Sequence, residues 1–143
     1  MQAAVNIPLA VGAMLSAIAA FLHLGIIAGG PAWYRFFGAG EKLARAAAQG
    51  RTYPALVTLA IATVLGVWSA YALAGAGLIR TLPMLKTALV AITAVYIVRG
   101  LGYAPLIVAK GGEITPFVVW SSLICLAYGL VHLLGLVQCW PAL

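Results

Sequence analysis

The sequence predicts an all-α integral membrane protein: a bundle of four transmembrane helices with a short interfacial helix between helices one and two. Composition is the first reason, because the hydrophobic fraction is 65% and the charged fraction only 7%. A soluble domain is roughly half apolar and about a quarter charged. The second reason is that four apolar runs each reach the ~20 residues that a bilayer-spanning helix needs. Since the chain has 143 residues, these runs leave no room for a separate soluble domain, and residues 1–143 are predicted to form one transmembrane domain.

The first helix is predicted over about 7–28. Asn6 precedes Pro8 at its start, and an asparagine cap followed by proline in the first turn is typical of helix N-termini. Gly29, Gly30 and Pro31 are expected to end it.

The connection after this helix begins with aromatic residues around Arg35 and continues into the alanine-rich stretch 41–49. Glu41 and Arg45 are spaced to pair on a helix, and Gly50 would stop it. We expect this short helix to lie on the membrane surface.

The other three helices are predicted over about 53–74, 82–107 and 116–137. Each starts with threonine shortly before proline, at Thr52, Thr81 and Thr115. Glycines end the second helix, and Pro105 is expected to end or kink the third.

The distribution of basic residues predicts the orientation. Four of them lie in the first connection, Arg35, Lys42, Arg45 and Arg51, whereas the second connection holds only Arg80. Cytoplasmic loops are enriched in Lys and Arg, so both termini are expected in the periplasm. The size and the alanine- and glycine-rich composition favour a bacterial inner membrane. The net charge of +6 is thus assigned to topology and to contact with anionic lipid, not to nucleic acid.

Arg99 lies well inside the third apolar run, and an ionisable residue there is a functional-site hypothesis by default. Tyr96 and Tyr103 share its helix face, so Arg99 could hold an anionic or carbonyl-bearing ligand between two phenols. An equally weighted alternative is that the guanidinium snorkels to the headgroups. His23 is expected at a similar depth, and Glu41 is a candidate counter-ion, although its pairing with Arg45 is favoured. The predicted ligand site therefore comprises His23, Tyr96, Arg99, Tyr103 and Glu41.

A polar stripe runs along the fourth helix. Ser121, Cys125, Tyr128 and His132 are spaced to share one face, and lipid-facing helix surfaces are apolar, so this face should contact protein. Ser121, Tyr128 and His132 form a second predicted cluster, for which helix packing is favoured over a lined cavity.

No cofactor, metal site or catalytic residue is predicted. His23 and His132 are expected roughly 15 Å apart along the membrane normal, which disfavours haem held between them. The chain has no Asp and only two Glu, so carboxylate-rich metal sites and acid–base dyads lack support.

Three hypotheses for the function follow. The favoured one is a non-enzymatic protein that binds or transports a small hydrophobic or anionic ligand within the bundle. The second is an accessory subunit or assembly factor of a larger membrane complex, and the third is an enzyme acting on a lipid-like substrate. The expected partners are membrane lipids, a small ligand, and a second copy of the chain or a partner membrane subunit.

Overall fold

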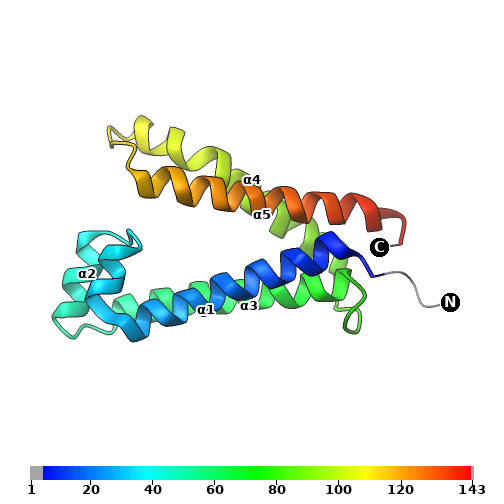
Figure 1. Ribbon diagram of the computed structural model, residues 1–143, viewed down its shortest axis with the longest axis horizontal. Coiled ribbons are helices and arrows are strands. Elements are labelled where there is room, and N and C mark those ends of the chain that lie inside the picture. The colour runs from blue at the N-terminus through cyan, green and yellow to red at the C-terminus, as the bar shows by residue number, and fades with distance from the viewer. Residues whose placement is uncertain (1–4, 143) are drawn as a thin grey trace. The chain divides into compact units, whose positions relative to one another are not determined.

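The structure, a computed structural model, describes residues 5–142, which form helices and turns without a β-strand. The helices are α1 (Ile7–Phe36), α2 (Glu41–Ala48), α3 (Tyr53–Gly75), α4 (Leu85–Ala109) and α5 (Pro116–Cys139), followed by the 3₁₀ turn η1 (Trp140–Ala142) (Figure 1). The four helices other than α2 are each long and apolar enough to cross a membrane. The predicted all-helical class, with a short helix between the first two long ones, is confirmed.

Two of the predicted helix caps are present. The side chain of Asn6 accepts a hydrogen bond from the backbone N–H of Leu9 at 2.9 Å. Thr115 accepts one from Val118 at 3.3 Å, with Pro116 in the first turn. Both side chains satisfy a backbone donor that has no partner within the helix.

The third long helix begins three residues later than the approximate start predicted at residue 82. Helix α4 begins at Leu85 because Met84 adopts a left-handed conformation (φ 54°, ψ 33°), which a right-handed helix cannot include. Pro83 therefore precedes the helix instead of lying in its first turn.

The predicted end of the first helix also needs correction, whereas the third long helix ends within two residues of the predicted position. Gly30 does interrupt α1, with φ 62° and ψ −151°, but helical backbone resumes at Pro31 and continues to Phe36. Proline is tolerated there because it opens the resumed segment, where its missing N–H would have no partner. Pro105 lies inside α4, which continues to Ala109.

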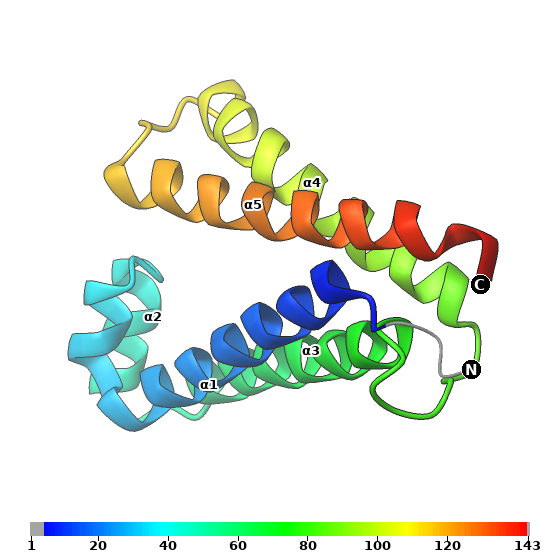
Figure 2. The same cartoon turned by 45° about the vertical axis from the view of Figure 1, so that its right-hand side comes forward.

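The chain divides into two compact units, each described here by itself. Unit 1 comprises Met1–Leu15 and Trp68–Leu143, and unit 2 comprises Ser16–Val67. In unit 1, α4 and α5 lie side by side (Figures 1 and 2). The core of unit 1 includes Leu9, Leu89 and Leu136, so it joins the beginning of α1 to α4 and α5.

Glycines allow α4 and α5 to approach closely. A Cβ added to Gly100 would lie 2.7 Å from the backbone nitrogen of Leu126, and one added to Gly129 would lie 3.0 Å from that of Ile97. Small residues at helix contacts let backbones pack directly against each other. This packing fixes which faces of the two helices meet, and so which side chains can meet in unit 1.

In unit 2, α2 lies near the end of α1 and the beginning of α3 (Figure 2). Buried Tyr34, Ile26 and Ala44 form its core. The hydroxyl of Thr58 donates to the carbonyl of Pro54 at 2.8 Å and lies 3.0 Å from the hydroxyl of Tyr34. Since the one hydroxyl hydrogen of Thr58 is already used, Tyr34 is the donor, and this bond ties α1 to α3.

Candidate functional site

An open groove of about 530 Å³ runs along one face of α4 in unit 1, and all its lining residues belong to this one helix. Its lining residues repeat at helical spacing: Ala94, Val95, Val98, Arg99, Gly102, Tyr103 and Leu106. Apart from the guanidinium and the phenol, these side chains are apolar. The groove therefore combines an apolar wall with one cation.

The Arg99 guanidinium is held by two neighbours. Its Cζ atom lies 3.6 Å from the centroid of the Tyr103 ring, one helical turn further along α4, which is a cation–π contact. Its Nη2 donates to Oγ of Ser121 on α5 at 3.4 Å, and that hydroxyl in turn donates to the carbonyl of Val118 at 3.3 Å. The ring and the hydroxyl together orient the guanidinium plane.

A different nitrogen of the same guanidinium, Nη1, is in another situation. Nη1 of Arg99 is buried, and no hydrogen-bond partner for it exists within residues 5–142. A buried donor without an acceptor costs about 1–3 kcal/mol, more when it is charged. An oxygen of a carboxylate, phosphate or carbonyl group that reached Nη1 would remove that cost.

A second cluster in unit 1 surrounds His132, whose side chain is fully buried. Its Nδ1 lies 2.8 Å from the carbonyl oxygen of Tyr128. A carbonyl only accepts, so Nδ1 carries the hydrogen and Nε2 of the neutral ring presents a lone pair. Nε2 is also buried and lacks a partner in the described part of the chain.

The ring of Tyr96 packs against this histidine and also contacts two further aromatic rings. The centroid of the Tyr96 ring lies 5.2 Å from that of His132, 5.5 Å from that of Tyr128 and 5.0 Å from that of Trp68. On the α1 side, Gly12 leaves room for the imidazole, because a Cβ there would lie 2.7 Å from Cε1 of His132. Tyr96 and Gly12 thus both border the buried imidazole.

The two predicted clusters are divided differently in the structure. Tyr96 was expected with Arg99, and its ring contacts Tyr128 and His132. Ser121 was expected with His132, but its hydroxyl bonds Arg99. Helical spacing gives the face of one helix correctly, but which residues of two helices meet depends on how they pack.

His23 and Glu41 belong to unit 2, whereas Arg99 and Tyr103 belong to unit 1. Nδ1 of His23 lies 2.7 Å from the carbonyl oxygen of Ala19, so this ring, like that of His132, bonds the preceding turn of its own helix. A ligand site shared by His23 and Arg99 stays a prediction.

Glu41 forms ion pairs within unit 2. Its carboxylate lies 3.2 Å from Nε of Arg35 and 3.1 Å from Nε of Arg45. Hydrogen bonds from Arg35 and then Arg45 hold the pKa of the Glu41 carboxyl below its ordinary value. The pair with Arg45 is the one the sequence favoured.

Residues that the sequence did not assign to a site also contribute. Gly12 leaves room for the ring of His132, and Trp68 packs against Tyr96, which in turn contacts His132. Ser122 is buried, and its hydroxyl has no partner among the residues described. A serine next to Ser121 gives no sequence signal that distinguishes the two.

In the described part of the chain, no three His, Cys, Asp or Glu side chains gather as a metal site would require. Comparisons with models of known protein families, with characterised proteins and with solved structures find no match for this chain.

Proposed function

We propose that this chain is a multi-pass membrane protein that binds a small amphipathic molecule, with an apolar body in the α4 groove and an anionic or carbonyl head on Arg99. The single observation that carries the proposal is the buried, unpaired Nη1 of Arg99 at an apolar groove. A cation inside an apolar segment is costly unless an acceptor meets it. Arg99 is one of the residues that line the groove, which supports binding of such an acceptor there.

The size and chemistry of the groove support a small ligand. Pockets for small molecules span roughly 300–1,000 Å³ and combine an apolar lining with few polar groups, and this groove has about 530 Å³. The planar guanidinium offers parallel donors to a carboxylate or phosphate. Stacking on the Tyr103 ring fixes the orientation of the guanidinium plane before a ligand binds, which lowers the entropic cost of binding.

Snorkelling is the competing explanation for Arg99. A snorkelling side chain extends toward headgroups and water. The Arg99 side chain instead lies on the Tyr103 ring and bonds Ser121, and one of its nitrogens is buried. These contacts support a held guanidinium.

The test is native mass spectrometry of the protein extracted in mild detergent. We expect the wild type to retain a small molecule and Arg99→Gln to lose it. Arg80→Gln, which removes an exposed cation from the loop between α3 and α4, should retain it. Equal retention by the Arg99 and Arg80 variants, or no bound molecule in the wild type, would overturn the proposal.

The proposal includes a bacterial inner membrane, with both termini in the periplasm. Its support is that the described residues hold four candidate spans, and an even number of spans would place both termini on the same side of a membrane. The connection between α1 and α3 also holds Arg35, Lys42, Arg45 and Arg51, a bias typical of cytoplasmic loops. A C-terminal alkaline phosphatase fusion should be active in cells and a C-terminal fluorescent-protein fusion dark. The reverse result would invert the orientation.

A second candidate function is that of an accessory subunit, in which a partner helix covers the same groove. Its support is that the groove residue Val98 is 67% exposed and Leu106 50% exposed. The mass spectra separate the two candidates, because a retained polypeptide that Arg99→Gln releases would favour the subunit.

A further inference from the structure

Half of the basic residues of this chain lie in one connection. Arg35, Lys42, Arg45 and Arg51 account for four of the eight Lys and Arg, and Glu41 is the one carboxylate among them, which leaves a net charge of +3. All five side chains are exposed. The connection is therefore a concentrated positive surface on unit 2.

Helix α2 presents part of this charge away from the protein. Its Ala44 is fully buried against Ile26 and Tyr34, and Leu43 and Ala47 pack around the same core. Residues three and four apart share a helix face, so Lys42 and Arg45 lie on the opposite side. The apolar face of α2 is thus covered by protein, and its basic face is left open.

Exposed aromatic rings border the cations. Phe36 is 84% exposed, next to Arg35, and Tyr53, two residues after Arg51, is 64% exposed. Rings at the ends of long apolar helices are typical of the membrane–water interface, where their apolar part enters the headgroup layer. Basic residues flanked by such rings are also typical of segments that lie on anionic membranes.

We propose that the basic face of α2 and its flanks, Arg35, Lys42, Arg45 and Arg51, bind the headgroups of anionic phospholipids. Charge complementarity favours this ligand, since the surface carries a net charge of +3 and the lipid phosphate is negative. The proposal rests on the membrane insertion proposed above, and is independent of the groove at Arg99. The recognised group is the phosphodiester of a lipid held in the leaflet.

Glu41 reduces the positive charge that this surface offers to lipid. Its carboxylate forms ion pairs with Arg35 and Arg45 and so offsets part of their charge. No ion pair engages Lys42 or Arg51 within residues 5–142. These two cations should therefore contribute most to lipid binding, and removal of the carboxylate should strengthen it.

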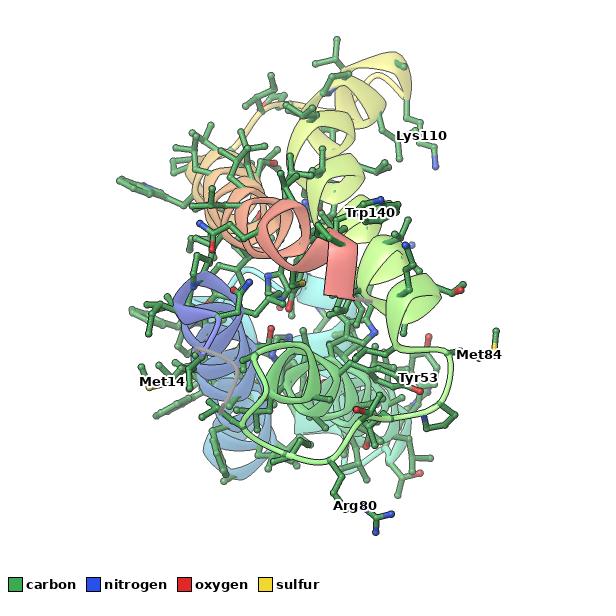
Figure 3. The ribbon with its side chains drawn as sticks, turned by 90° about the vertical axis from the view of Figure 1, so that its right-hand side faces the viewer. Met14, Tyr53, Arg80, Met84, Lys110 and Trp140 are labelled. Carbon is green, nitrogen blue, oxygen red and sulfur yellow. The ribbon has the colours of Figure 1, made fainter. Side chains whose placement is uncertain are left out.

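The experiment measures retained phosphatidylglycerol relative to phosphatidylcholine by native mass spectrometry, after equilibration in mixed micelles of the two lipids at low salt. We expect the wild type to prefer phosphatidylglycerol. Each cation of such a clustered basic surface is worth roughly fivefold in affinity, so Lys42→Gln with Arg51→Gln should lose most of the preference. The matched control, Arg80→Gln with Lys110→Gln, removes two exposed cations that lie singly in the other connections (Figure 3) and should reduce the preference much less.

Two further measurements make the result decisive. Glu41→Gln should increase the preference for phosphatidylglycerol roughly fivefold, a gain that a misfolded variant would not give. High salt should reduce this preference in every variant, because it screens the charges. No preference in the wild type, an equal loss in the control, or displacement of the lipid by inorganic phosphate would overturn the proposal. Arg99→Gln should keep the preference, so failure of the ligand proposal can be told from failure of this one.

Discussion

The imidazole of His132 occupies the space that a side chain at Gly12 would need, because a Cβ at residue 12 would lie 2.7 Å from Cε1 of that ring. The ring is fully buried, and its Nδ1 bonds the carbonyl of Tyr128. It therefore has little freedom to move aside. The contact joins the beginning of α1 to α5.

Gly12→Ala should lower the thermal stability of the protein in detergent. Alanine is the better helix former by about 1 kcal/mol, but overpacking a buried contact costs about 1–3 kcal/mol. Gly66→Ala is the control, since a Cβ at that helical glycine would meet no atom within 4 Å, and it should keep or raise stability. If Gly12→Ala unfolds at the same temperature as Gly66→Ala, the contact with His132 is not formed.

Gly100→Ala should weaken the packing of α4 on α5. The added methyl group would lie 2.7 Å from the backbone nitrogen of Leu126, and backbone cannot rotate away as a side chain can. We expect a loss of about 1–3 kcal/mol in the free energy of unfolding, measured in detergent. Gly102→Ala, two residues along the same helix, has open space at its Cβ and should lose nothing. Equal stability of the two variants would contradict the close approach.

Arg99→Lys should destabilise the protein, because lysine keeps the charge but loses the planar group that stacks on Tyr103 and bonds Ser121. The cation–π contact alone is worth about 0.5–2 kcal/mol. Thermal unfolding in detergent should show the loss, whereas the exposed-site control Arg80→Lys should match wild type. Tyr103→Phe, which keeps the ring, should also be tolerated. A wild-type melting temperature for Arg99→Lys, with only a small loss for Arg99→Ala, would instead indicate snorkelling.

The ion pairs of Glu41 should make the docking of α2 depend on acid pH. The arginines lower the pKa of this carboxyl in the folded protein below its ordinary value of 4.5. The stabilisation is thus complete above that value and is lost as the pH falls through the lower, folded-state pKa. Amide hydrogen exchange of α2 in Glu41→Gln should be faster than in wild type at pH 7 and equal to it once the wild-type carboxylate is protonated. A difference that persists at acid pH would show that the ion pairs are not its cause.

The sequence by itself determined the elements. Apolar runs of span length, capping by Asn6 and Thr115, and the glycine that follows the alanine-rich stretch 41–49 are local signals, and the helices that they predicted are present. Where local signals misled, backbone conformation decided: Met84 adopts a left-handed conformation, and α1 resumes after Gly30. The Glu41–Arg45 pair was also predictable, because both residues lie one turn apart on a single helix.

Only the tertiary structure decided which residues meet across helices. Spacing put Tyr96 on the same face of α4 as Arg99, yet its ring contacts Tyr128 and His132, whereas Arg99 reaches Ser121. These partners depend on the register of α4 against α5. That register is set by the close approach at Gly100 and Gly129, and a glycine in a sequence does not say which backbone will lie against it. The periodicity of one helix defines its faces, but the pairing of two faces depends on packing between residues distant in the chain.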